Sequence, residues 1–373
     1  MILWGVLLIY CGGGMEEGRH NRDVDVLRGL AIVLVVSYHM AAVSYLPESI
    51  KFLLAIFNGS FGVDLFFVIS GFLVSSSLAR ALNARMQGIT SVLRVYFARR
   101  WFRTILPAIV WVVIWTLLSF VTPYFGIFSN NFHHAVSAVF QWAHIFLYVE
   151  CVKGDGCGLF GYYWSLSLEE WFYLLLPLFF IVIKGRAVCI VISLLLVALF
   201  YLAFQGWPLW GVFRIEPMLC GILVYYFRVP LIQWISSRSY IKFFWCVVPV
   251  LLLVCMYATA NFFGKAYVLI VLSCVFLLVI SLPDKGCLMP QRAARLFESA
   301  GKFSFSIYLV HVPLIWFVGR LYEGYSGWIA IFFFNSLLFL LVWGLSAASF
   351  RWLELPSRNV GYWVSRKLES QKN

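Results

Sequence analysis

The chain has 373 residues, of which 63% are hydrophobic and only 12% are charged. A soluble globular domain needs a larger polar surface, so the composition excludes that class and predicts a chain that lies in a lipid bilayer. Long apolar runs favour a helical bundle over a β-barrel, because a membrane helix needs ~20 apolar residues. The net charge of +12 does not indicate a nucleic-acid partner, since the charges flank the apolar runs and form no separate basic domain.

Ten apolar segments are candidates for membrane-spanning helices, each near the ~20 residues that cross a bilayer. In chain order they cover residues 26–46, 61–79, 104–121, 163–183, 187–204, 209–227, 243–260, 267–282, 303–320 and 327–349. An eleventh apolar segment, 135–149, is shorter and contains Gln141 and His144. The positions of lysine and arginine in the links between segments indicate whether 135–149 crosses the membrane.

Lysine and arginine gather in cytoplasmic loops, and each additional crossing reverses the side of every later loop. If 135–149 does not cross, the basic links after it lie inside, together with the link RVYFARRWFR and the basic C-terminal end. The outer side then keeps few cations, and Arg214 falls within a span; the outer cations are Lys51, Lys153, Lys265 and Arg320. We therefore predict an all-α polytopic membrane bundle of about ten transmembrane helices plus one short re-entrant or interfacial helix, with both termini cytoplasmic.

This topology divides the chain into three parts: an N-terminal cytoplasmic segment, 1–25, a membrane domain, 26–356, and a C-terminal cytoplasmic tail, 357–373. Cys151 and Cys157 lie in the stretch CVKGDGC, which the topology places outside the membrane. A disulfide and two free thiols are both open there, because oxidation is possible on that side.

The first predicted span contains the stretch LRGLAIVLVVSYHM, which is apolar except at its arginine and its histidine. Eleven helical residues separate Arg28 from His39 by about 16 Å along the axis and bring both to one face. A boundary arginine by itself is typical of a side chain that reaches lipid phosphate. A histidine deep in a span is costly and usually faces a bundle interior, where it can exchange a proton near neutral pH.

Polar side chains of other spans are expected to gather with His39 in a polar core. They are Asp64, Ser70, Glu169, Glu170, Tyr173, Arg214, Glu216, Ser304, Tyr308 and His311. Ionisable groups inside a membrane indicate function by default. The alternative is a structural network in which Asp64, Arg214 and the glutamates serve as mutual counter-ions.

Six motifs occur in an order that resembles the acyltransferase-3 family of integral-membrane acyltransferases. They are RGLAIVLVVSYHM with its R-x10-H spacing, FFVISGF, YFARRWFRTILPA, WSLSLEEWFY, FSFSIYLVHVPL and RWLELPSR, between residues 22 and 358. The resemblance implies an O-acetyltransferase that moves an acyl group, most often acetyl from acetyl-CoA, to a hydroxyl of an envelope carbohydrate. Polysaccharide, the lipopolysaccharide O-antigen and glycolipid are the acceptors that it implies. Some family members carry an appended extracytoplasmic domain, whereas we expect the membrane part of this chain to complete the transfer.

Acyl transfer to a hydroxyl needs a base for the hydroxyl proton and donors for the oxyanion. His39 is the candidate base, or a transient acyl carrier in a two-step route. The family pattern W-S-L-x-x-E points to Glu169 as a group that orients the imidazole or acts as partner base. Tyr173, Tyr308 and His311 are candidate donors to the oxyanion or the sugar.

The phosphates of the donor call for cations on the cytoplasmic side. We expect them to bind a set of four arginines while the pantetheine arm extends inward: Arg28, Arg99, Arg100 and Arg103. The alternative for each arginine is a topology-setting charge against anionic lipid. At the outer mouth, Trp164 could stack on a sugar together with Tyr162 and Tyr163, or belong to an ordinary interfacial belt; Asp64 and Arg214 could line the same mouth.

No permanently bound cofactor and no metal are expected, because His133, His134 and His144 lack a completing carboxylate or cysteine. The expected partners are acyl-CoA, an envelope glycan or glycolipid acceptor and membrane lipids, without nucleic acid and with a homo-oligomer left open. The expected location is the bacterial inner (cytoplasmic) membrane. Alternatives are a transporter or flippase of lipid-linked sugars, an inactive scaffold, and a transferase for another acyl group such as succinyl.

Overall fold

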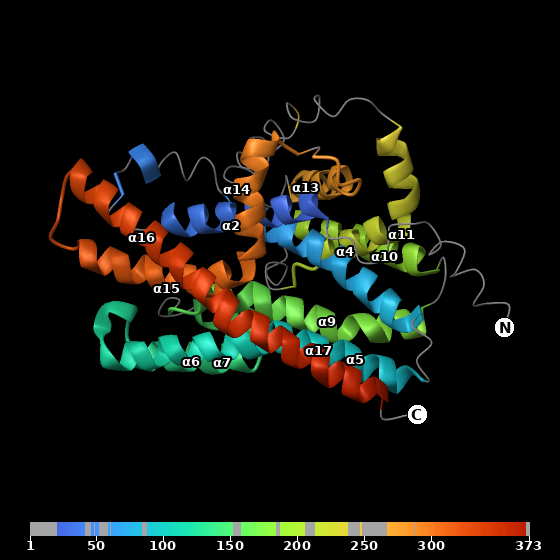
Figure 1. The fold of residues 1–373 in the computed structure, drawn as a ribbon, viewed down its shortest axis with the longest axis horizontal. Coiled ribbons are helices and arrows are strands. Elements are labelled where there is room, and N and C mark those ends of the chain that lie inside the picture. Colours follow the sequence, from blue (N-terminus) through green and yellow to red (C-terminus); the bar gives the residue numbers. More distant parts are fainter. Residues whose placement is uncertain are drawn as a thin grey trace. The chain divides into compact units, whose positions relative to one another are not determined.

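The computed structural model describes residues 21–41, 46–47, 49–51, 59, 61–83, 88–151, 158–183, 187–205, 213–237, 247, 267–286 and 288–370. Within these ranges all regular secondary structure is helical, which confirms the predicted all-α fold (Figure 1). Among the described residues, seven helical stretches are long and apolar enough to cross a membrane: Phe61–Leu82, Ile89–Val121, Gly161–Val182, Ala187–Phe204, Glu216–Ser236, Ser304–Tyr322 and Trp328–Ser370. Tyr267–Ser281 is apolar but shorter.

Most predicted spans correspond to one helix each. The helices are α2 (Arg22–Ala41), α4 (Phe61–Asn83), α6 (Ile105–Val121), α9 (Trp164–Val182), α10 (Ala187–Phe204), α11 (Glu216–Ser236), α13 (Tyr267–Ser281), α15 (Ser304–Tyr322) and α16 (Trp328–Ser349). Three further helices are more polar: α5 (Ile89–Arg103), α14 (Gln291–Lys302) and α17 (Leu355–Ser370). The predicted span 243–260 lies outside the described residues, apart from one helical residue at position 247.

The prediction for 209–227 was wrong in its bounds. Helix α11 begins at Glu216 and continues to Ser236, so Arg214 lies just before the helix and not within a span. Pro217 supplies the physical reason, because proline lacks an N–H and fits an α-helix best in its first turn. The hydropathy of the preceding residues does not reveal that boundary.

The segment 135–149 does not form one helix of spanning length. Helix α7 (Phe128–Val139) ends two residues before Gln141, which has a positive φ of 61°. A four-residue helix, α8 (Ala143–Phe146), follows, and a π-helical turn, η2 (Leu147–Cys151), succeeds it. A membrane crossing needs ~20 helical residues, so this geometry agrees with the prediction of a short helix that does not cross.

The chain divides into two units, and each is built around its own helix contacts. The first unit comprises residues 1–35, 55–76 and 173–302. Its helices approach closely at glycines: Gly29 of α2 lies against the carbonyl of Phe297 in α14, and Gly221 of α11 lies against the carbonyl of Val68 in α4. Small residues permit such crossings in membrane proteins because they let two backbones meet.

We expect Gly301→Ala to destabilise the protein, because a Cβ on Gly301 would overlap the carbonyl oxygen of Asp25 in α2. The cost should be about 1–3 kcal/mol, as for other overpacked sites. Gly344→Ala in α16 is the matched control, since a Cβ at that helical position would meet no atom within 4 Å. Thermal unfolding in detergent should show a lower Tm for the first variant only; equal values would contradict the close crossing.

The second unit comprises residues 36–54, 77–172 and 303–373. Helices α5 and α17 lie side by side in it (Figure 1). The hydroxyl of Ser357 in α17 donates to the carbonyl of Phe102 in α5. Helix α15 packs on α16, and it is tied to α6 by the Trp115 indole, which donates to the carbonyl of Leu309 over 3.2 Å. These contacts position the residues of the candidate site.

Candidate active site

Two histidines from distant parts of the chain meet in the second unit. His39 lies in the last turn of α2, and His311 lies in the middle of α15. The Nε2 atom of His311 is 3.2 Å from the Nδ1 atom of His39, and the ring centroids are 5.0 Å apart. His311 is fully buried, whereas His39 is half-buried. The pair therefore has one buried member and one accessible member.

The hydrogen bonds fix the order of protons along this pair. The Nδ1 atom of His311 lies 2.8 Å from the carbonyl oxygen of Tyr308 and 3.1 Å from that of Ile307. A carbonyl oxygen only accepts, so Nδ1 of neutral His311 carries the proton and its Nε2 carries a lone pair. His39 then donates from Nδ1, which places the lone pair of the neutral His39 ring on Nε2. This is the arrangement by which a second group orients a general base.

Aromatic and hydroxyl groups frame the two imidazoles. The ring of Tyr162 lies 5.3 Å from that of His311 and 6.4 Å from that of His39, edge-on in both cases. Tyr308 donates its hydroxyl proton to the carbonyl of Tyr162, so Ser165, 3.0 Å away, donates to the Tyr308 oxygen. The hydroxyl proton of Tyr308 is thus bound to a backbone carbonyl. Tyr308 lies at the site and helps to hold the residues around the two imidazoles.

A second polar cluster of the same unit joins α5 to α9. The hydroxyl of Thr104 lies 2.5 Å from the buried carboxyl of Glu170, and the charges of Arg100 and Arg103 act on that carboxyl. Arg100 is buried and Arg103 is half-buried. Of the predicted donor-binding arginines, these two therefore lie together.

Arg99 points elsewhere, although it is the neighbour of Arg100 in sequence. Its guanidinium donates to the hydroxyl of Ser365 at 3.0 Å and pairs with Glu369 at 3.1 Å, both in α17. It also lies over the ring of Tyr362, 5.8 Å from the centroid. The structure thus places Arg99 on the face of α5 that packs against α17.

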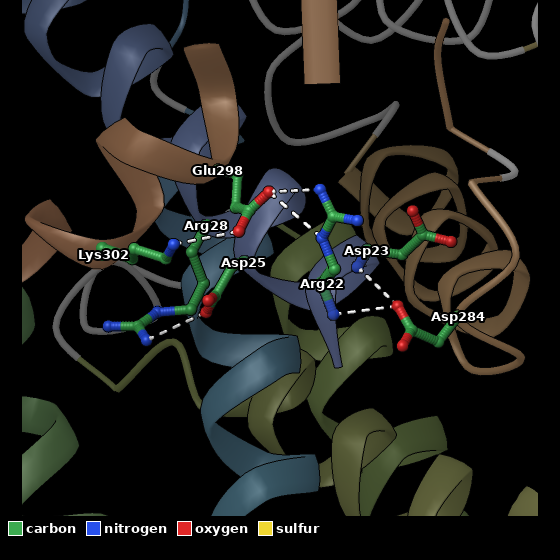
Figure 2. Close-up of polar contacts among 7 residues, drawn as sticks. All are labelled: Arg22, Asp23, Asp25, Arg28, Asp284, Glu298 and Lys302. Atoms are coloured by element: carbon green, nitrogen blue, oxygen red, sulfur yellow. Dashed lines mark hydrogen bonds and ion pairs between the residues drawn. The ribbon is translucent and has the colours of Figure 1, made fainter. Parts of the chain in front are cut away.

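Arg28 lies in the first unit, within a mixed ionic cluster at the start of α2 (Figure 2). It pairs with Asp25 at 3.7 Å, one turn earlier in the same helix. Nearby, Glu298 of α14 binds Arg22 and Lys302, each at 2.9 Å. Hydrogen bonds from Arg22 and Lys302 lower the pKa of Glu298, and the bond from Arg22 has the larger effect. Arg28 is therefore surrounded by charges of both signs.

The same cluster fixes the N-terminus of α2. Asp284 accepts from the backbone N–H groups of Arg22 and Asp23, at 2.9 and 3.2 Å. Asn21 accepts from the N–H of Val24 at 2.9 Å. Free N–H groups at a helix start favour such acceptors, so the loop after α13 anchors the helix that carries Arg28 and His39.

Asp64 and Arg214 form a buried ion pair in the first unit. Arg214 also donates from Nε to the hydroxyl of Tyr267 at 3.2 Å, and its guanidinium lies over that ring, 4.8 Å from the centroid. Glu216 is fully buried near this group and acts on it electrostatically. Asp64 and Arg214 are therefore counter-ions of each other, and their predicted role at the acceptor mouth stays a prediction.

The remaining predicted residues are distributed over both units. Glu169 and Trp164 lie half-buried on α9, Tyr173 lies buried further along the same helix, and Ser70 is half-buried on α4. The disulfide question stays a prediction, because the side chains of Cys151 and Cys157 lie outside the described part of the chain.

Sequence reasoning missed three groups that the structure brings to these clusters. Tyr267 carries no signal in sequence, because a single tyrosine in an apolar helix is common. Thr104 stands within the motif YFARRWFRTILPA, which could have marked it. Ser165 stands within the motif WSLSLEEWFY, which could have marked it.

His144 belongs to neither cluster. It is buried, its Nδ1 atom lies 2.8 Å from the hydroxyl of Ser167, and burial lowers its pKa to about 4. A neutral ring in this place ties α8 to α9.

A family model described as an acyltransferase domain matches residues 21–348 of the chain. The chain belongs to the acyltransferase-3 family. Among similar proteins is an O-acetyltransferase OatA of Staphylococcus aureus, 24% identical over 96% of this chain and 60% of its own length. A peptidoglycan O-acetyltransferase OatA of Listeria monocytogenes is 31% identical over 43% of this chain and 24% of its own length.

The chain spans about 60% of the length of the staphylococcal relatives, so the activity and substrates of a whole relative do not transfer directly to this acyltransferase-3 chain. No solved structure matches it. The relatives are named as transferases, and the alternative of a transporter or flippase receives no support from them.

Proposed function

We propose that this chain is a membrane O-acyltransferase that moves an acetyl group from acetyl-CoA to a hydroxyl of an envelope glycan. The single observation that carries the proposal is the contact between His39 and His311, because it presents a base whose tautomer is already set. Family membership and the names of the relatives support the reaction class. The bacterial inner membrane and cytoplasmic termini belong to the same proposal.

The reaction follows from the tautomer. Nε2 of His39 takes the proton of the acceptor hydroxyl as its oxygen bonds to the acyl carbon. The carbon–sulfur bond then breaks, and the proton passes from His39 to the departing thiolate, so that charge and atoms balance. His311 is a positioning residue: it accepts from Nδ1 of His39 throughout and stabilises the imidazolium that forms between the two steps.

We assign the donor phosphates to Arg100 and Arg103 at the end of α5. Arg100 is buried and Arg103 is half-buried one turn later on the same helix, and the charges of both act on the buried carboxyl of Glu170, which Thr104 also binds. Arginine suits phosphate because its planar group donates two hydrogen bonds to two oxygens.

We take a peptidoglycan strand as the first acceptor to test, because relatives carry that substrate in their names. The experiment incubates the full chain in lipid nanodiscs with acetyl-CoA labelled in the acetyl group and with soluble glycan strands. The expected result is alkali-labile label on the glycan and stoichiometric release of CoA. CoA release without labelled glycan, or no release at all, would contradict the proposal for this acceptor.

The donor assignment predicts a selective effect of Arg103→Ala. Its KM for acetyl-CoA should rise about tenfold, which corresponds to one charge-assisted hydrogen bond of about 1.4 kcal/mol, while the KM for the glycan stays unchanged. Arg94→Ala is the matched control, because Arg94 is exposed on the same helix. Steady-state kinetics against donor concentration measure both variants. Equal donor KM values in the two would remove Arg103 from the donor site.

A further inference from the structure

A cavity of about 660 Å³ opens at one end of the second unit. It lies where α6 ends, where the 3-10 turn η1 (Pro123–Phe125) leads into α7, and where α15 ends. Its volume falls within the range of about 300–1,000 Å³ that ligand sites usually have. In the predicted topology these helix ends face outward, on the side of the glycan.

The wall of the cavity combines aromatic rings with a charged pair. Phe120, Tyr124 and Phe128 line it and are partly exposed. At the end of α15, Arg320 and the first residue after the helix, Glu323, line it and pair at 2.7 Å, with about half of each side chain exposed. Rings of this kind offer flat apolar faces, while the guanidinium and carboxylate offer several donors and acceptors.

The aromatic rings are held in place before any ligand binds. Tyr124 contacts Phe317 edge-on at 6.0 Å, and Phe120 contacts Phe128 edge-on at 5.2 Å. The loop below them is fixed by Asn131, whose amide donates to the carbonyl of Phe125 at 2.7 Å. A site whose walls do not need to be ordered loses less free energy on binding.

The loop backbone is fixed as well. Gly126 has a positive φ of 88° and lies beside Asn131 and Trp316, so a side chain at that position would be strained. Asn131 also accepts from the backbone N–H of Leu159 at 2.9 Å, which ties the loop to a third segment. The cavity is therefore built by the fold.

We infer that this cavity binds an oligosaccharide, as a subsite for the part of the glycan acceptor that lies beyond the reacting sugar. The inference rests on the proposed function and extends it. A sugar has apolar faces for the rings and hydroxyls for the charged pair, and an acidic sugar adds a carboxylate for Arg320. A lipid tail would gain nothing from an exposed ion pair and would desolvate it.

The position along α15 suits a remote subsite. Nine residues separate His311 from Arg320, which is about 14 Å along the helix axis. The sugar bound in the cavity is therefore not the one that reacts. Binding energy from such a remote contact can hold the strand while the reacting hydroxyl meets His39.

The test measures equilibrium binding without donor, so it does not depend on transfer. The full chain in nanodiscs is titrated with a tetrasaccharide of alternating N-acetylglucosamine and N-acetylmuramic acid. We expect saturable binding, and we expect Kd to rise at least tenfold in Tyr124→Ala and in Arg320→Gln. Phe339→Ala is the matched control, because Phe339 is exposed on α16 and does not line the cavity.

Each outcome decides the inference. Absence of saturable binding to the wild type, or equal Kd values in the variants and the control, overturns it. A cavity occupied by lipid would show unchanged tetrasaccharide binding and loss of co-purified lipid in Tyr124→Ala, which also overturns it. Arg320→Gln serves as a second variant: its side chain is also partly exposed, so we expect it to fold even if Tyr124→Ala does not. If the wild type binds the tetrasaccharide but transfers no acetyl group, the proposed function is contradicted and the binding site is supported.

Discussion

Replacing His39 by alanine should reduce acetyl transfer by about 10²- to 10⁴-fold, the contribution expected of a positioned general base. The reason is that the hydrogen bonds of His311 leave the lone pair of neutral His39 on Nε2, where it can accept the proton of the acceptor hydroxyl. Initial rates with labelled acetyl-CoA measure the loss. His133→Ala is the matched control, because His133 is exposed on α7, and it should keep the wild-type rate.

The role of His311 is tested by a pair of variants. His311→Ala should lower kcat and leave both KM values unchanged, since the residue acts on His39 and not on the substrates. His311→Gln should recover part of the rate, because the glutamine carbonyl can accept from Nδ1 of His39. Equal kcat values for the two variants, or a change confined to KM, would show that His311 only fills space.

Sequence patterns place one of the two histidines of this site, His39, but do not identify its partner. The spacing of Arg28 and His39 predicted a single helix that carries both, and α2 contains them. The partner of His39 could not be found in the same way, because His311 is 272 positions away and helix periodicity describes only neighbours on one helix. The motif FSFSIYLVHVPL marked His311 as polar core, and the fold supplied its contact.

The arginines show a similar limit. A cluster such as Arg99, Arg100 and Arg103 reads as one basic surface in sequence, but successive helical residues point about 100° apart. Arg99 therefore meets Glu369 of α17, while its neighbour Arg100 is buried near Glu170. Which face meets which helix depends on packing between segments that are far apart in the chain.

Removing one member of the Asp64–Arg214 pair should cost about 3–5 kcal/mol of unfolding free energy, because the other charge would stay buried without its counter-ion. Both side chains are almost fully buried, at 0% and 7% exposure. Asp64→Asn and Arg214→Met test each loss, and Asp64→Leu combined with Arg214→Met should recover most of it. Unfolding in mixed micelles gives the free energies.

The exposed pair of Arg99 and Glu369 is the matched control, with side chains 41% and 39% exposed. Arg99→Met should cost about 0–1 kcal/mol, since water compensates the charge that remains. The comparison also separates the two predicted roles of Asp64. If Asp64→Asn unfolds like the wild type but raises the KM for the glycan, Asp64 belongs to the acceptor site. If stability falls and the double variant restores both stability and transfer, the pair holds the first unit together and takes no part in the chemistry.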